Sequence, residues 1–353
     1  MTLLPYKLNF IDPIYIRENE KLESKNGFII KVEKNNIISF ADVSPLQYLN
    51  LETYDDVYQE CKKIDINRIF EDIDFFLKTK EEFFIQEKFL DFDFSKYTKL
   101  PSLKHGLSCL FSDHYRQKLK LKISGDVYFH GLIPNRLTQS SQDEVVKRSN
   151  LMEKNGFKKA KLKIGSLKTT SETLKNDNNL IKKILAGTTN LQLRLDANKN
   201  FKLEDFPTLL DGIDLKRIDY VEEPVSKSSD LVHFTTNTKL SIAIDENIHL
   251  MKDIIFEKVS AVIIKPTLLG DYYTLKRLIQ TYSKRGISAV FSSCFESQVG
   301  IYQIAQLAHV FNPQESHGLD TFDCYLESLM DLNVHSNAIT LQENIELKGP
   351  IYI

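Results

Sequence analysis

The chain has 353 residues, of which 42% are hydrophobic and 27% charged, as is ordinary for a globular protein with room for a barrel and a smaller domain. Its net charge of −2 and the absence of a basic cluster give no reason to expect a nucleic-acid partner. No apolar run approaches the roughly 20 residues that cross a membrane, and the first residues do not resemble a signal peptide, so we expect a cytoplasmic protein without a membrane partner.

The first 120 or so residues mix strand and helix patterns and are expected to form an α+β domain. Apolar alternation predicts strands in residues 6–10 and 27–46, the second region folding as a hairpin that turns at Lys34–Asn36. The polar residues 15–27 between them are expected to be an exposed loop, although Arg17 and Lys25 could instead close over a substrate. Helices are expected from Thr53 towards Cys61, from Asp65 to Lys80, and from Pro101 to residue 117, with the aromatic residues 81–92 as a further helix or connector.

From about Asp126 the pattern changes to alternating strands and helices. Near-continuous apolar runs predict seven buried strands, in residues 127–134, 161–165, 191–198, 218–224, 241–246, 261–266 and 287–294. Helical patterns occupy residues 141–155, 170–186, 203–212, 229–236, 252–257, 271–285 and 297–311. Seven or eight such units in about 200 residues favour an α/β fold, a TIM-like (β/α)7–8 barrel.

The sequence therefore divides into three parts. Residues 1–122 are expected to form the α+β domain and residues 123–330 the barrel. The last part, residues 331–353, alternates like strands from Ala338 onwards and is expected to return to the first domain.

Five charged residues stand at the ends of five consecutive predicted strands: Lys163, Asp196, Glu222, Asp245 and Lys265. Charges at the ends of buried strands are costly unless they are paired, bound to metal or catalytic. A parallel barrel places its active site at these strand ends. If Lys163 ends the second strand, Lys265 ends the sixth and faces it across the barrel mouth, with the three acids on the arc between them.

Three carboxylates without Cys or His suit a hard cation, so Mg²⁺ is expected, with Mn²⁺ as the alternative. A base beside the ion must be a neutral lysine, and Lys161 has the same side-chain direction as Lys163, two residues away. This like charge, together with the cation, should lower the pKa of Lys163.

Other interpretations of these charges stay open. The five residues could form structural ion pairs around the barrel, although their order and spacing favour a site. Glu223 is adjacent to Glu222 and Glu246 to Asp245, and a one-residue change of strand phase would turn the other acid inward.

The motifs K-L-K, R-L-D-A-N, V-E-E-P and D-E-N, with the lysine after the sixth strand, resemble the muconate-lactonizing subgroup of the enolase superfamily. This resemblance selects Asp196, Glu222 and Asp245 as the metal ligands. Within the subgroup, residues 262–270, 291–301 and 317–325 resemble the o-succinylbenzoate synthases. The likeness is good over residues 126–325, whereas the first domain resembles the family's capping domain only in layout.

The resemblance implies a Mg-dependent syn-dehydration of 2-succinyl-6-hydroxy-2,4-cyclohexadiene-1-carboxylate to 2-succinylbenzoate, a step of menaquinone biosynthesis. Lys163 would remove the proton α to the carboxylate and then assist the departure of hydroxide from the same face. Lys161 would help to hold the enediolate, and Lys265 would stabilise the anionic ring from the opposite side. The expected partner is a small carboxylate substrate.

Further positions near these strand ends are weaker candidates. Arg194 and Asn198 flank Asp196 and are expected to support it from outside the ligand set. Residues expected to contact the substrate, or to shape the backbone around it, are Ser292, Ser293, Gly318 and Asp320.

Two classes of rival remain. An N-acylamino-acid racemase or a dipeptide epimerase of the same subgroup would use two opposed lysines in the same way. Such epimerases carry a D-x-D motif near the last strand, whereas Asp320 and Asp323 here do not have that spacing, and K-P-T-L after the sixth strand favours the synthase. A non-catalytic binding barrel would be expected to have lost a ligand or a lysine, and none is missing.

Overall fold

The structure is a computed structural model, and it describes residues 1–17, 20–46, 49, 52–79, 91–133, 142–165, 169–225, 227–249, 258–343 and 346–348. Three sheets occur in these ranges: one of seven strands and two of three strands. None of the helices in the same ranges combines the length and the apolar character that a membrane span requires.

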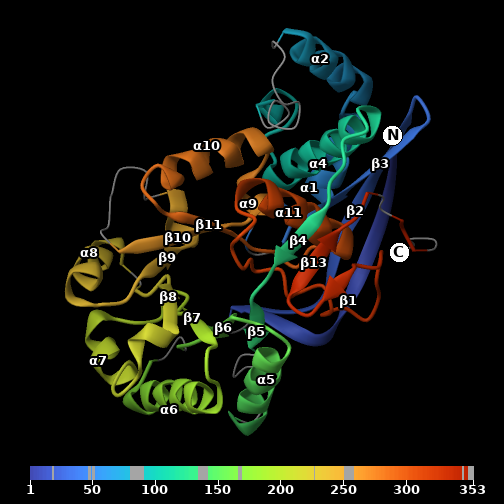
Figure 1. Cartoon of the computed structure of the whole chain (residues 1–353). Coiled ribbons are helices and arrows are strands. Elements are labelled where there is room, and N and C mark those ends of the chain that lie inside the picture. The colour runs from blue at the N-terminus through green and yellow to red at the C-terminus, as the bar shows by residue number, and fades with distance from the viewer. Residues whose placement is uncertain are drawn as a thin grey trace.

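The seven-stranded sheet is parallel throughout and curls into the wall of a barrel (Figure 1). Its strands are β5 (Gly131–Ile133), β6 (Lys159–Lys163), β7 (Gln192–Asp196), β8 (Ile218–Glu222), β9 (Ile242–Ile244), β10 (Val259–Ile264) and β11 (Ser288–Phe291). They follow one another in chain order from one edge to the other. These are the seven strands expected from the apolar runs, so the predicted TIM-like fold class is confirmed.

A short segment after the last barrel helix joins the two edges of this sheet. His317 forms a parallel bridge with Phe129, and Gly318 forms one with Ser292 at the end of β11. The N–H of Gly318 donates to the carbonyl of Phe291 over 2.7 Å. Two residues therefore take the place of an eighth strand, which closes the ring.

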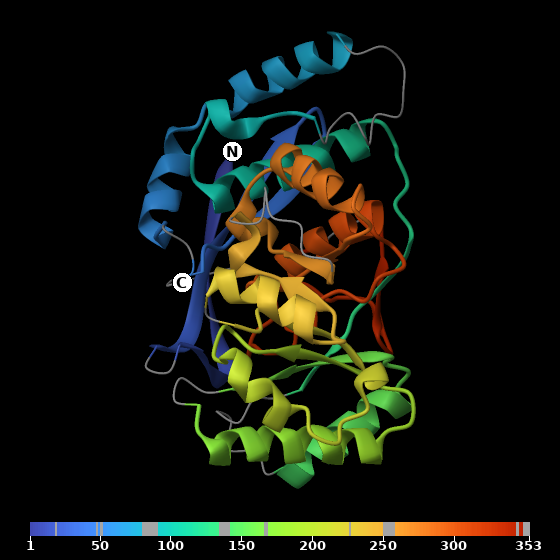
Figure 2. The ribbon, with the colours of Figure 1, turned by 90° about the vertical axis from the view of Figure 1, so that its left-hand side faces the viewer.

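Helices cover the outside of the ring, close to where the sequence predicts them (Figure 2). They are α5 (Gln142–Lys154), α6 (Ser171–Gly187), α7 (Phe206–Leu209), α8 (Ser228–Asn237), α10 (Tyr272–Ser283) and α11 (Gln298–Phe311). A four-residue helix, α9 (Pro266–Leu269), was not expected, and four 3₁₀ turns occur at Phe94–Lys96, Leu203–Asp205, Leu215–Arg217 and Glu246–His249. The helix expected at residues 252–257 lies outside the described residues.

The amino-terminal sheet is an antiparallel meander of β1 (Thr2–Arg17), β2 (Glu20–Lys34) and β3 (Ile37–Val43). Asn35 and Asn36 make the turn between β2 and β3 with positive φ angles of 54° and 61°, so the predicted hairpin is confirmed. The expected exposed loop at residues 15–27 is wrong, because β1 and β2 pair through most of this stretch. Within β2, Leu22 and Lys25 are buried whereas Lys21 and Glu23 are exposed, so one face of this strand is turned towards the protein interior.

Among the described residues, three helices accompany this sheet: α1 (Tyr54–Lys63), α2 (Ile66–Thr79) and α4 (Pro101–Lys118). Thr53 caps α1 through a reciprocal pair of hydrogen bonds with Asp56, and Asp65 accepts from the N–H of Asn67 at the start of α2. All three helices begin where the sequence predicts. Of the aromatic stretch 81–92, only the last two residues are described.

Residues near the carboxyl end pair with the strand that precedes the barrel. β12 (Val334–His335) and β13 (Ala338–Leu341) form a sheet with β4 (Gly125–Tyr128), in which β13 runs antiparallel to β4 (Figure 1). Residues 338–341 thus pair with the strand from which the chain continues into the first barrel strand. The division at residues 122 and 330 stays a prediction.

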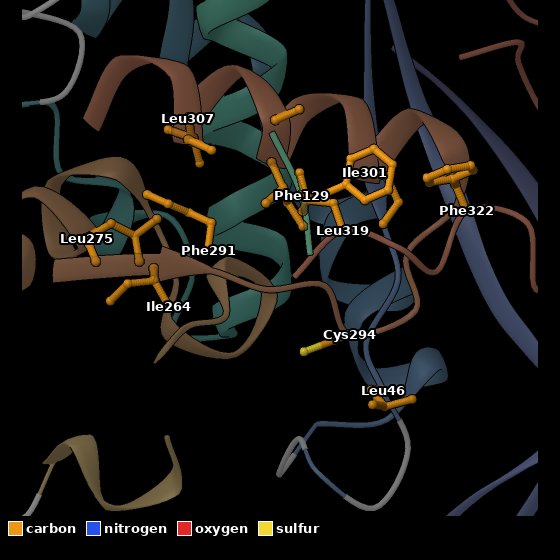
Figure 3. Packing of buried hydrophobic residues seen from close by; sticks show 14 of the residues in the cluster. Leu46, Phe129, Ile264, Leu275, Phe291, Cys294, Ile301, Leu307, Leu319 and Phe322 are labelled. Carbon is orange, nitrogen blue, oxygen red and sulfur yellow. The ribbon is translucent and has the colours of Figure 1, made fainter. Parts of the chain in front are cut away.

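One apolar cluster includes residues from both the first sheet and the barrel. Figure 3 shows Leu46, which follows β3, at the edge of this cluster below Cys294, which follows β11. Helix α4 brings the two regions together, because it packs on β3 with one side and on α9 with another. The position of the first domain over the barrel mouth is therefore set by buried apolar contacts.

Gly106 in α4 allows the close approach of this helix to β3. A Cβ atom at this position would lie 2.3 Å from Cγ2 of Val43 and 3.2 Å from the carbonyl oxygen of Asp42. We expect Gly106→Ala to lower the free energy of unfolding by about 1–3 kcal/mol through overpacking, less a gain of up to about 1 kcal/mol in helix propensity. Urea denaturation measures this change, and a variant as stable as the wild type would contradict the packing described.

Candidate active site

A cavity of about 930 Å³ lies at the carboxyl ends of the barrel strands, beneath the first domain. Barrel residues that carry its chemistry include Lys161, Lys163, Asp196, Asp245 and Lys265. The first domain contributes Asp12, Pro13, Ile14, Leu46, Leu49, Glu52, Lys99, Leu100 and Pro101. The volume suits a small organic ligand, and both parts of the chain would enclose it.

The two lysines of the predicted pair lie on opposite sides of this cavity. Lys163 ends β6 and Lys265 follows β10, and three strands, β7, β8 and β9, lie between them in the sheet. Those strands end at or just before the three predicted acids. The structure therefore has the order that strand counting predicted, with the two lysines facing each other and the three acids on the strands between them.

The three acids are buried and each is paired with a lysine. Asp196, Glu222 and Asp245 are 7%, 1% and 7% exposed. Lys161 Nζ lies 2.8 Å from Asp196 Oδ2 and 2.9 Å from each carboxylate oxygen of Glu222. The ammonium of Lys265 forms an ion pair with Asp245. Two lysines therefore offset two of the three carboxylate charges of the acidic cluster.

The acids strongly influence one another. Burial, together with the nearby carboxylate of Asp196, raises the pKa of Glu222 to about 8. Burial would lower the pKa of Lys161, but Asp196 and Glu222 outweigh this effect and the pKa is raised well above its ordinary value. A cluster of this kind requires cations beside it, because buried like charges cannot all ionise alone.

Lys163 differs from the other two lysines. No hydrogen bond or ion pair joins its Nζ to another side chain in the described ranges of the chain. Burial, followed by the positive charges of Lys161 and Lys265, lowers the pKa of Lys163, with Asp196 acting in the opposite direction. The predicted direction of the shift is confirmed, although burial contributes more than the neighbouring lysine.

The donor set fits a hard divalent cation. Three carboxylates are the ligands that Mg²⁺ prefers. Asn198 adds a buried amide oxygen, Oδ1, that has no hydrogen-bond partner within the part of the chain that the structure describes. The backbone N–H of Asn198 donates to Asp196 Oδ1 over 3.2 Å, which places Asn198 beside the acidic cluster. In the described ranges, however, no group of three Asp, Glu, His or Cys side chains is already arranged closely enough to hold a metal ion. Asp196, Glu222 and Asp245 would hold the ion.

The structure distinguishes Glu222 from its neighbour Glu223. Glu223 Oε1 accepts from the N–H groups of Asp245 and Asn247 at 2.8 and 2.9 Å, and its Oε2 accepts from the Asn247 amide at 2.7 Å. Glu223 thus holds the turn after β9, and Glu222 is the acid beside Lys161. Glu246 lines the cavity as Asp245 does, so the choice between those two rests on the ion pair of Asp245 with Lys265.

All four residues expected to contact the substrate line the cavity: Ser292, Ser293, Gly318 and Asp320. A Cβ atom on Gly318 would lie 2.8 Å from Ser292 Oγ, so this close approach requires glycine. Ser293 Oγ is 2.6 Å from the hydroxyl of Thr321. Asp320 Oδ2 accepts from the N–H of Leu132 over 2.7 Å, which ties this carboxylate to β5.

Arg194 lies below the cavity and does not line it. Its guanidinium, 1% exposed, contacts Asp219 Oδ2 at 2.8 Å and Glu315 Oε1 at 2.6 Å, and Lys159 pairs with the same two acids. Arg194 also donates to Nδ1 of His130 over 2.8 Å, so the neutral ring of His130 carries its proton on Nε2. The predicted supporting role of Arg194 stays a prediction, and its contacts are with the barrel floor.

Several lining residues were not identified from the sequence. His130 follows β4 just before the first barrel strand, and its place near a strand end was an available signal. Arg148 lies on α5, and Phe295 lies in the turn after β11. Arg148, like the residues from the first domain, has no strand-end position that could have indicated it, whereas Phe295 follows the end of β11.

Residues 144–339, more than half of the chain, match a family model described as enolase C-terminal domain-like. The chain belongs to the enolase superfamily. Members of this superfamily act on small carboxylate substrates. An o-succinylbenzoate synthase of Vibrio cholerae serotype O1 is 29% identical over 337 residues, which cover 93% of this chain and 91% of that protein.

Solved structures agree on the fold but differ in activity. The L-Ala-D/L-Glu epimerase from Bacillus subtilis superposes with a TM-score of 0.75 at 14% identity, covering 98% of this chain and 97% of that one. The o-succinylbenzoate synthase from Thermosynechococcus elongatus BP-1 was solved with magnesium in its active site. It superposes with a TM-score of 0.67 at 18% sequence identity, covering 93% of this chain and 94% of that one. At these identities the likeness establishes the enolase fold and leaves the reaction to be argued from the site.

Glu315 is expected to make folding sensitive to acid. Burial raises the pKa of its carboxyl, but Arg194 and Lys159 outweigh burial and lower the pKa from 4.5 to about 2. Its ionised form therefore stabilises the fold above pH 4.5, and this contribution is lost as the pH falls towards 2. We expect Glu315→Gln to lower the free energy of unfolding by on the order of 2–3 kcal/mol at pH 7 and by progressively less below pH 4.5.

Urea denaturation of the wild type and the variant between pH 3 and 7 measures this difference. Glu343→Gln, at a residue 59% exposed on its side chain, is the matched control and should change little at any pH. A pH-independent difference for Glu315→Gln would show that its charge is not the cause.

Proposed function

We propose that this enolase-superfamily protein is an o-succinylbenzoate synthase, a carbon–oxygen lyase of menaquinone biosynthesis in the cytoplasm. It would dehydrate 2-succinyl-6-hydroxy-2,4-cyclohexadiene-1-carboxylate to 2-succinylbenzoate. The observation that carries the proposal is the difference between the two opposed lysines: among the described residues Lys163 has no ion-pair partner, whereas Lys265 is held by Asp245. The sequence relatives with this activity support it over nearly the whole chain.

Lys163 would act as the base. A neutral amine at this position would accept the proton from the carbon α to the substrate carboxylate, which breaks the C–H bond. The resulting ammonium would then donate a proton to the departing hydroxyl group on the same face, so that water leaves and the ring becomes aromatic. Burial and the positive charge of Lys161 favour the neutral form that the first step needs.

The other charged residues would stabilise the negative charge that develops on the substrate. Mg²⁺ held by Asp196, Glu222 and Asp245 would supply Lewis-acid stabilisation of the substrate carboxylate. Lys161 would place an ammonium group near the same carboxylate. Lys265 would remain cationic on the opposite side of the cavity, where it would stabilise the planar anionic ring.

Racemases and epimerases of the superfamily are the main alternative. Racemisation needs each lysine to serve as a base in turn, whereas here one ammonium is held in an ion pair. A dipeptide substrate also needs an acid for its amine. Asp320 lies near the last strand, where epimerases carry their D-x-D motif, but one of its carboxylate oxygens accepts a hydrogen bond from the N–H of Leu132. Both features favour the one-base dehydration.

The first test is turnover. With Mg²⁺ and the cyclohexadiene substrate we expect the aromatic product to form, as followed by its ultraviolet absorbance. Lys163→Ala should lower kcat by about 10²–10⁴-fold, the range that a positioned general base contributes. Lys199→Ala, at a lysine that pairs with Glu246 at 3.7 Å outside the proposed machinery, is the control.

The same preparation decides between the two reaction classes. Exchange of the α-proton in N-acylamino acids or dipeptides, without turnover of the cyclohexadiene substrate, would reject the dehydration and favour racemisation. Full activity of Lys163→Ala would reject Lys163 as the base.

The second test is metal binding, read without catalysis. Isothermal titration with Mg²⁺ should show one site, and Asp245→Asn should weaken it at least about tenfold because one of three charged ligands is lost. Glu246→Gln changes the neighbouring acid of the same cavity and should weaken it much less. The reverse order of the two variants would assign the ligand to Glu246 instead.

A further inference from the structure

The turn between β11 and α11 is held from outside the barrel by a buried lysine of the first sheet. Lys25, on β2, is 3% exposed, and its Nζ donates to the carbonyl of Cys294 over 2.5 Å. On the adjacent strand β1, Lys7 is exposed. Lys25 is thus a charged residue that the first sheet directs into the interface with the barrel.

Burying an ammonium group is costly unless it is well partnered. Glu296, 2% exposed, supplies the nearby negative charge, and its own oxygens accept from the N–H of Cys294 at 2.6 Å and from the hydroxyl of Thr267 at 2.5 Å. Thr267 lies two residues after Lys265. The charge of Lys25 is therefore balanced by an acid that belongs to the turn itself and connects it to the neighbouring strand end.

This turn has an unfavourable backbone conformation. Phe295 has a φ of 57°, in the left-handed region that a bulky side chain rarely adopts. Such a conformation persists only where the surroundings fix it. The side chains that hold the turn therefore determine its shape.

Two further side chains hold the turn. The hydroxyl of Tyr325 donates to the carbonyl of Phe295 over 2.6 Å. Asp42 Oδ2 accepts from the N–H and the hydroxyl of Ser297 at 3.0 and 2.9 Å. Lys25 and Asp42 come from the first sheet, so that sheet supplies two of these contacts.

The turn also forms part of the cavity wall. Phe295 lines the cavity, and so do Ser292 and Ser293, which immediately precede the turn. The ring of Phe295 packs edge-on against Phe10 of β1 at 5.8 Å. Figure 3 shows Cys294 at the edge of the cluster, between the barrel core and Leu46. A change in the turn would move an aromatic surface that a bound ring would contact.

We infer that Lys25 is a positioning residue: by holding the carbonyl of Cys294 it fixes the turn that presents Phe295 to the substrate. The first domain therefore shapes the substrate site through a backbone contact, in addition to covering it. This inference deepens the proposed function, and its kinetic test rests on that function. Its structural test does not.

The structural test is amide hydrogen exchange followed by mass spectrometry. Lys25→Met keeps much of the side-chain volume and removes the ammonium, and Lys25→Arg keeps a cationic donor. We expect faster exchange in Lys25→Met, confined to peptides that cover residues 292–300, with partial restoration in Lys25→Arg. Lys7→Met, at the exposed lysine of β1, is the control and should match the wild type.

Tyr325→Phe provides a second, milder variant in case Lys25→Met does not fold. It removes the hydroxyl that holds the next carbonyl of the same turn and should raise exchange in the same peptides. Unchanged exchange in both the Lys25 variants and Tyr325→Phe would overturn the inference. Faster exchange spread over the whole barrel would overturn it too, because Lys25 would then serve general stability.

The kinetic test separates positioning from a loss of folded enzyme. A displaced Phe295 weakens contact with the substrate in the ground and transition states alike, so we expect Lys25→Met to raise KM about tenfold with kcat within about threefold of the wild type. Loss of folded protein would lower apparent kcat at unchanged KM and would contradict the inference. If the wild type does not turn over the cyclohexadiene substrate, the proposed function fails, and the exchange data alone decide the role of Lys25.

Discussion

Mutual repulsion among three buried carboxylates is the constraint on which the rest of this site depends. Asp196, Glu222 and Asp245 end three adjacent strands, and burial prevents water from screening them. Lysines lie on both sides of these acids, and two of them, Lys161 and Lys265, form ion pairs with the carboxylates. The same arrangement would give a hard cation its ligands, and it leaves Lys163 without an ion pair among the described residues, so the balance of charge and the proposed chemistry have one origin.

Much of the barrel and of the acidic cluster follows from the sequence, because both depend on local pattern. Strands buried on both faces produce near-continuous apolar runs, and a charge at the end of such a run stands out. From the residues alone, the choice between Glu222 and Glu223 needed the strand phase, which the structure supplies through the ion pair of Glu222 with Lys161 and the hydrogen bonds of Glu223 in the turn after β9. The choice of substrate rests on family likeness, because the same five residues suit several reactions of the superfamily.

The first domain is where sequence reasoning was weakest. Residues 15–27 are polar, and polarity alone indicated a loop, yet the stretch belongs largely to a paired hairpin that buries Lys25. Leu22 and Lys25 are buried, whereas Lys21 and Glu23 are exposed, so a charge occupies one inward position and interrupts the usual apolar alternation of a strand. Which residues of this domain reach the cavity depends on packing between distant segments, as at Leu46, and no local pattern encodes that packing.

The floor of the barrel has a further consequence for the field at its mouth. Arg194 and Lys159 are matched there by Asp219 and Glu315, two cations against two anions, and His130 above them is held neutral by burial and by Arg194. A balanced floor contributes little net potential to the cavity over the neutral pH range. A ligand in the cavity would therefore be selected mainly by the charged residues at the carboxyl ends of the strands. Substitutions there can alter selectivity without changing the charge balance of the barrel floor.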